Sequence, residues 1–120
     1  MRPLKSQNPE LLSVIHDLRK KAKESNAVIW LDVAKRLSSS RRRRVAVNLS
    51  RLNRYTEEKE TLIVPGKVLG SGKIEHPLIV AAFAFSDQAQ SKIVSAKGKC
   101  LTIQDLLETN PKGSNVRVME

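Results

Sequence analysis

Apolar side chains recur at helical spacing through the first third of the chain. The pattern predicts a helix from Pro9 to Ser25, with Asn8 as its capping residue. It predicts a second helix from Ala27 to Leu37, capped by Asn26, so that the two helices would form a hairpin. The positions that carry this periodicity are Leu11, Ile15, Leu18, Ala22, Val33, Ala34 and Leu37.

The spacing of apolar residues changes after residue 44. The alternation over residues 45–49 predicts a short strand or extended segment, and Ser50–Tyr55 is expected to form a helical turn. Thr61–Val64 is predicted to be a strand that Pro65-Gly66 closes. Gly66–Lys73 contains three glycines and is expected to be a loop or an irregular hairpin.

Strand and helix patterns alternate in the C-terminal part of the chain. Leu78–Phe85 is a continuous apolar run, typical of a strand covered on both faces. Strands joined by helices predict right-handed parallel crossovers. The predicted fold class is therefore α/β, with an N-terminal helical hairpin and a basic extended segment before a small strand–helix–strand–helix–strand core. Two further helices are predicted. The first begins at Ser86 or Asp87, has Ala89, Ile93 and Ala96 on one face and stops at Gly98, and the second is a short helix through Leu106 and Leu107 that begins with a Thr102–Asp105 capping box and ends before Pro111. Two further strands are predicted over Lys99–Ile103 and Val116–Val118.

The charge is divided unequally along this single domain of 120 residues. The net charge is +10, and residues 1–54 hold 14 basic and 4 acidic residues, whereas residues 55–120 hold 8 of each. We therefore divide the domain into a basic tail (1–8), a basic helical and extended half (9–54) that is expected to bind the partner, and an α/β half (55–120). Such asymmetry indicates a polyanion as partner. Because only 3% of the residues are aromatic, phosphate and shape contacts are a better expectation than base stacking.

Other composition features argue against several classes of protein. The one cysteine, Cys100, cannot form a disulfide framework or a cysteine metal site within one chain. The N-terminal residues do not have the pattern of a secretory signal, and the longest apolar run is too short to span a bilayer. The expected location is the cytoplasm.

Four consecutive arginines, Arg41–Arg44, are the most informative local feature. Adjacent like charges repel one another, and arginine forks bind phosphate oxygens in bidentate fashion. The run therefore predicts phosphate binding, against the alternative of a solvated or targeting-type basic cluster. Asn48, Arg51 and Arg54 follow closely, although Asn48 could equally satisfy a turn.

No pattern of catalytic residues stands out in the sequence. The stretch GKVLGSGK resembles a nucleotide-binding loop, but Ser71 stands where the second glycine is needed and Ile74 where a hydroxyl should hold magnesium. Its glycines could still bring backbone amides close to RNA phosphates. His16 and His76 lack partners at ligand spacing, and no nucleophile–base pair can be assembled. The acidic group Glu57, Glu58 and Glu60 is expected to be a solvated turn, and neither a catalytic residue, a cofactor nor a metal site is predicted.

Three stretches carry a resemblance to a known family: residues 35–55 (KRLSSSRRRRVAVNLSRLNRY), residues 62–93 with PGKVLG, HP and FS in that order, and residues 102–120. With the opening helix, they cover essentially the whole chain. The chain resembles the archaeal and eukaryotic large-subunit ribosomal protein eighteen-e family, which is related to bacterial large-subunit protein fifteen. Its short ends resemble the archaeal members, and its basic balance differs from a halophile's acidic surface. Val45 departs from the small residue or proline expected there.

The resemblance implies a structural constituent of the large ribosomal subunit and not an enzyme. It implies 23S-type rRNA and neighbouring large-subunit proteins as partners, a monomer within the particle, and no membrane, small-molecule substrate or cofactor. Arg41–Arg44, Asn48 and Arg51 match the family's basic motif, and Gly66, Lys67 and Gly70 match its glycine-rich loop. Basic residues elsewhere are expected to add contacts to rRNA, the tail residues by ordering on binding. These further candidates are Arg2, Lys5, Lys20, Lys35, Arg36, Arg54, Lys73, Lys112 and Arg117.

Two other functions remain to be weighed. The helical hairpin could be the helix-turn-helix of a DNA-binding regulator, although it lacks a tight glycine turn and its second helix is apolar early. The glycine-rich stretch could belong to a phosphotransfer enzyme, which the failed spacing argues against.

Overall fold

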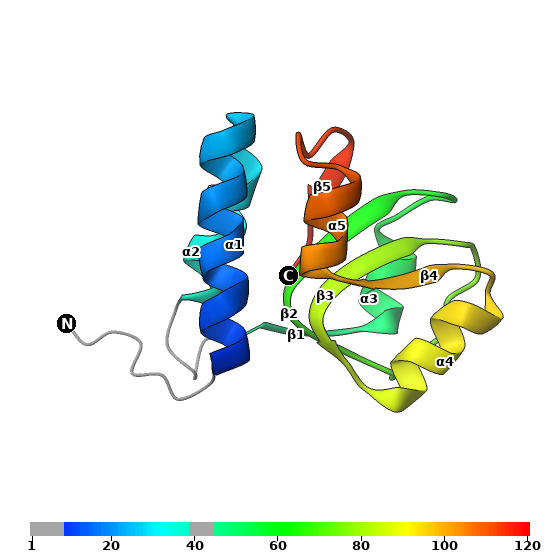
Figure 1. The fold of residues 1–120 in the computed structure, drawn as a ribbon. Helices are drawn as coiled ribbons and strands as arrows, with labels where there is room; N and C mark the ends of the chain where they lie inside the picture. The colour runs from blue at the N-terminus through cyan, green and yellow to red at the C-terminus, as the bar shows by residue number, and fades with distance from the viewer. Residues whose placement is uncertain (1–8, 39–44) are drawn as a thin grey trace.

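A parallel sheet with helices on both faces forms the centre of the molecule (Figure 1). The computed structural model describes residues 9–38 and 45–120. Among these residues, no helix combines the length and the apolar composition needed to cross a bilayer. The elements in chain order are α1 (Pro9–Ser25), α2 (Val28–Leu37), β1 (Val45–Asn48), α3 (Leu49–Arg54), β2 (Thr61–Leu69), β3 (Ile79–Phe85), α4 (Asp87–Ser95), β4 (Lys99–Thr102), α5 (Ile103–Thr109) and β5 (Val116–Val118).

Strand β2 organises the sheet because one of its edges carries two strands. The order is β1-β2-β3-β4, and β5 also pairs with β2. Strand β1 pairs with the C-terminal half of β2, from Val45↔Gly66 onward, while β5 pairs with the N-terminal half, from Thr61↔Val116 onward. All the pairings are parallel, as the predicted alternation of strands and helices requires. The α/β fold class is confirmed.

Apolar side chains from the two faces of the sheet build two separate cores. On one face, α1, α2 and α5 pack against Ile63 and Ala81. On the other face, α3 and α4 pack against Leu62, Val64 and Val80. The alternation of buried side chains along β2 and β3 supplies both cores, so these strands are covered on both sides, as the apolar run in β3 predicted.

The helical hairpin is confirmed, with one correction. Helix α1 has the predicted bounds, but Asn26 does not cap α2. Asn26 has φ 54 and ends α1, because the Ala27 amide donates to the Ala22 carbonyl in the bond that closes many helix C-termini. Asparagine tolerates this left-handed conformation better than most residues. The predicted cap at Asn8 lies outside the described residues.

The predicted end of the second strand at Pro65-Gly66 is wrong. Strand β2 continues to Leu69, so the first part of the expected loop Gly66–Lys73 is strand. The pairing with β3 shifts register between Val64 and Lys67, and this irregularity accommodates a proline that has no amide to donate. On the other edge, β1 pairs with residues 66–69 and completes the ladder.

The ends of α4 and α5 follow the sequence signals closely. Ser86 caps α4 by accepting from the Ala89 amide at 3.1 Å. The predicted capping box of Thr102 and Asp105 is present and begins α5 at Ile103, which shortens the preceding strand by one residue. Lys97, at φ 68, ends α4 in place of the predicted Gly98. Gly98 is needed for space, because a Cβ there would lie 2.4 Å from the Leu78 carbonyl oxygen.

Trp30 joins α2 to the C-terminal part of the chain. Its side chain is fully buried in the core beside α1 and α5. Its indole Nε1 donates to the Pro111 carbonyl at 2.7 Å, in the connection between α5 and β5. The helical hairpin is therefore fixed to the sheet by a specific polar contact as well as by apolar packing.

Candidate nucleic-acid interface

Helix α3 presents two of the predicted arginines on an exposed surface. Arg51 and Arg54 are exposed, while Leu49 and Leu52 of the same helix are buried against the sheet. The guanidinium carbons of both arginines lie over the Tyr55 ring, at 5.1 and 6.0 Å from its centre. The shared aromatic ring places both cations around one side chain without neutralising either of them.

Arg36, from the last turn of α2, is brought to the same region by Glu120. The Arg36 Nη1 donates to the Glu120 carboxylate, and its Nε lies 3.2 Å from each carboxylate oxygen of Asp32. Arg51 Nε donates to the main-chain oxygen of Glu120 at 3.0 Å. Burial lowers the pKa of Arg36, but Asp32 and Glu120 together raise it above its ordinary value. We call Arg36, Arg51 and Arg54 the arginine cluster.

The loop after β2 lies against α3, beside this cluster. The Ser50 amide donates to the Ser71 carbonyl at 3.1 Å. Asn53 and Glu75 are joined twice, since Asn53 Nδ2 donates to Glu75 Oε1 at 3.1 Å and the Glu75 amide donates to Asn53 Oδ1 at 2.9 Å. Lys73 lies between these two attachments and is exposed.

One of the predicted glycines, Gly70, has a packing role. Gly66 and Gly70 are both buried. A Cβ at Gly70 would lie 2.7 Å from the Gln88 Cβ, so this glycine allows α4 to approach the loop. Lys92 of α4 then donates to the Gly70 and Gly72 carbonyls at 2.8 and 2.9 Å. These contacts fix the shape of the loop and leave Lys73 exposed.

Lys67 and Asn48 lie at the C-terminal ends of neighbouring strands. Lys67 pairs with Ala46 across the β1–β2 ladder, and both are exposed. Asn48 is exposed and precedes α3, but its side chain makes no capping hydrogen bond. The helix start therefore does not use its side chain, which weighs against the simple turn role that the sequence left open.

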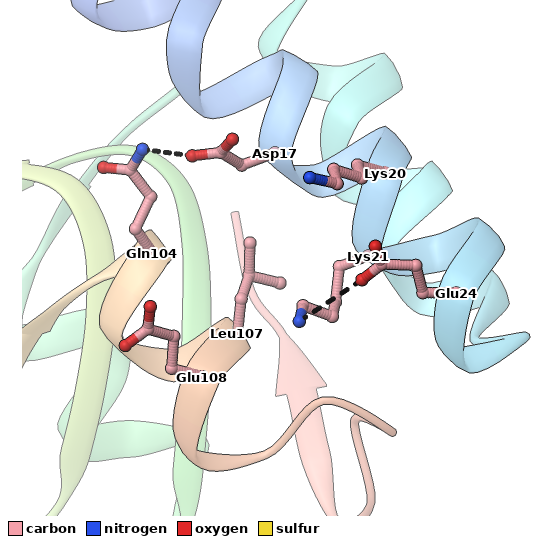
Figure 2. A pocket seen from close by; sticks show the side chains of 7 residues that line it. All are labelled: Asp17, Lys20, Lys21, Glu24, Gln104, Leu107 and Glu108. Atoms are coloured by element: carbon pink, nitrogen blue, oxygen red, sulfur yellow. Dashed lines mark hydrogen bonds and ion pairs between the residues drawn. The ribbon is translucent and has the colours of Figure 1, made fainter.

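Other predicted contacts lie away from the arginine cluster. Lys20 lines a hollow of about 210 Å³ between α1 and α5, where Asp17 accepts from Gln104 and Lys21 is 3.6 Å from Glu24 (Figure 2). Lys112 is exposed in the α5–β5 connection. Lys35 is exposed next to Arg36, while Arg117 is paired with Glu60 at 3.2 Å. The basic residues Arg2, Lys5, Arg41, Arg42, Arg43 and Arg44 lie outside the described residues.

Sequence reasoning missed the residues that hold the candidate interface together. Glu120 is 84 positions from Arg36 and 69 from Arg51, so no local spacing could relate them. Lys92, which fixes the glycine loop, likewise lies 22 positions from Gly70. Tyr55 could have been found, because a residue four positions after Arg51 lies on the same side of a helix.

Within residues 9–38 and 45–120, no group of three or more His, Cys, Asp or Glu side chains is placed to hold a metal ion. His16 is exposed, and His76 Nε2 lies 2.9 Å from the buried Thr56 hydroxyl, in a packing role. The loop after β2 leads into β3 and not into a helix, so it does not have the setting of a nucleotide-binding loop. The glutamates near residue 60 are mostly exposed, as expected of a solvated turn.

The hairpin does not suit DNA reading. The four buried side chains of α2, including Trp30, hold this helix in the core. Its exposed apolar positions, Val28 and Leu31, are poor readers of base edges.

Comparison with known proteins finds a family model and several relatives that are similar to this chain. The family model described as "Ribosomal protein 60S L18 and 50S L18e" matches residues 1–120. The "Large ribosomal subunit protein eL18" of Methanospirillum hungatei is 52% identical over 93% of both chains. The protein of the same name from Methanothermobacter thermautotrophicus is 46% identical over 100% of this chain and 99% of its own. That of Methanoregula boonei is 48% identical over 98% of each.

Proposed function

The chain belongs to the family of ribosomal proteins 60S L18 and 50S L18e, and from this membership we propose that it is a structural constituent of the archaeal large ribosomal subunit that binds folded rRNA through phosphate contacts. It acts in the cytoplasmic ribosome as one copy, beside neighbouring large-subunit proteins. No reaction is assigned to it.

The observation that carries the rRNA proposal is the arginine cluster. Residues from α2 and α3, separated in sequence by the run Arg41–Arg44, come together on an exposed surface around Glu120 and Tyr55. Guanidinium groups are weakly hydrated and planar, so they pair well with phosphate oxygens. A surface that gathers them from separate elements suits a folded polyanion better than a single strand.

The proposed interface extends from this cluster to two exposed lysines and an exposed asparagine. Lys67, Lys73 and Asn48 surround the C-terminal ends of β1 and β2 and form its second part. Gly70 supports the interface from inside by allowing α4 to approach the loop, and Gly66 remains a candidate contact. The tail residues Arg2 and Lys5 and the edge residues Lys20, Lys35, Lys112 and Arg117 remain candidate contacts to other rRNA segments.

The first test is the location of the chain in cells. We expect it to sediment with the large subunit in a sucrose gradient of cell lysate, at one copy per particle after a high-salt wash. Phosphate contacts weaken as salt rises, so retention through the wash requires many of them acting together within the assembled particle. Quantitative mass spectrometry of the gradient fractions measures this, and absence from washed subunits would remove the proposal.

A paired substitution tests the interface itself. We expect the Arg51→Gln, Arg54→Gln variant to bind transcribed large-subunit rRNA about tenfold more weakly than the parent chain, with a salt slope smaller by about one to two. Filter binding at several salt concentrations measures both quantities. The matched control is Lys97→Gln, Lys99→Gln, which removes the same charge near the opposite end of the sheet. Equal losses in the two variants would contradict the assignment of a local interface.

A further inference from the structure

Glu120 is an acidic residue that contacts two members of the arginine cluster, Arg36 and Arg51. Its carboxylate accepts from Arg36 Nη1, although Arg36 is already paired with Asp32 through Nε. Two carboxylates therefore share one guanidinium, while Arg51 holds Glu120 by its main-chain oxygen and Arg51 and Arg54 share the Tyr55 ring. Pairing Arg36 with two carboxylates reduces the attraction of this surface for a polyanion.

The Arg36–Glu120 pair has the geometry of an anion site. A carboxylate and a phosphate present oxygens to the edge of a guanidinium in the same fork arrangement. The side chains of Arg36 and Glu120 are 37% and 35% exposed, so a phosphate has access to the position that Glu120 fills. Asp32 lies on the same helix as Arg36, one turn before it, and keeps the guanidinium oriented when the outer partner changes.

We propose that the Glu120 carboxylate stands in for an rRNA phosphate on Arg36, and that a phosphodiester of the bound rRNA displaces it. This inference rests on the proposed function and assigns Arg36 a phosphate site that the free chain keeps closed. Arg51 faces the same site, because it holds the main-chain oxygen of Glu120 at 3.0 Å. The displaced carboxylate moves into solvent, and the incoming phosphate lies between the arginines of α2 and α3.

The test is the conservative variant Glu120→Gln. Glutamine keeps a hydrogen-bond acceptor for Arg36 but removes the competing charge, so we expect it to bind transcribed large-subunit rRNA about three- to tenfold more tightly than the parent chain, at about 0.15 M salt. The control Glu58→Gln removes the same charge at an exposed turn and should change affinity less than about twofold. In the Arg36→Met background, Glu120→Gln should give no gain.

The possible results separate the two proposals. A parent chain that binds the rRNA while Glu120→Gln binds equally or more weakly overturns this inference alone, since the carboxylate would then be a permanent part of the interface. A gain that persists in the Arg36→Met background overturns it as well. A parent chain that does not prefer the rRNA over an unrelated RNA of equal length overturns the proposed function. Thermal unfolding of each variant checks that the fold is unchanged.

Discussion

Replacing Arg41–Arg44 by glutamine is expected to lower the affinity for large-subunit rRNA by about 10²- to 10³-fold near 0.1 M salt. Each phosphate contact releases counterions and contributes about 0.7 to 0.9 to the slope of the logarithm of the affinity against the logarithm of the salt concentration. Four lost contacts should therefore reduce the salt slope by about three. Equilibrium binding measured at several salt concentrations gives the affinity and the slope together.

Two controls make this result specific to the run. Substituting Lys23, Lys59, Lys97 and Lys99 by glutamine removes the same total charge from other surfaces, and we expect a loss below about tenfold. Replacing the four arginines by lysine keeps the charge but not the forked donors, so the slope should be retained while affinity falls. If both glutamine variants lose affinity equally, binding depends on net charge and not on the position of the run.

The largest effect on stability is expected from Trp30→Ala, at about 4 kcal/mol. The substitution empties a fully buried site between α1, α2 and α5 and removes the hydrogen bond to the Pro111 carbonyl. Domains of this size are stable by only about 5–15 kcal/mol, so the variant should lose about a quarter to four-fifths of its stability. Urea unfolding followed by far-UV circular dichroism measures the free energy of unfolding, since the only tryptophan is lost.

The companion variant Trp30→Phe separates packing from the polar contact. It retains most of the buried apolar volume and removes the indole donor, so we expect a loss of about 1–2 kcal/mol. A Trp30→Ala variant that loses less than about 1 kcal/mol would show that the helical hairpin is not held to the sheet through this residue.

Much of the fold could be predicted because local signals and tertiary packing agree. The apolar period and basic last turn of α1, the Ser86 cap and the Thr102–Asp105 box all act within one or two turns of the chain. Prediction failed where partners distant in sequence decide the outcome. Pro65-Gly66 ends a strand in most local contexts, but β1 and β3 supply the pairing that carries β2 through it.

The candidate site likewise combines features that local sequence predicts with features that depend on residues distant in the chain. The exposed arginines of α3 follow from residue type and local helical spacing. Their connection to Arg36 does not, since it depends on Glu120 and on how β5 lies against β2. The glycines matched the expected motif, yet Gly70 proved to be a packing residue for α4, which no spacing rule would have revealed.

The way β5 completes the edge of β2 has a consequence for biosynthesis. During translation, residues 61–63 emerge well before residues 116–118, so this part of the ladder cannot form until β5 has left the exit tunnel. The contact between Glu120 and Arg51 forms even later. The nascent chain thus exposes its cationic segments while its native topology is incomplete, and we expect the arginine cluster to assemble only after β5 has emerged.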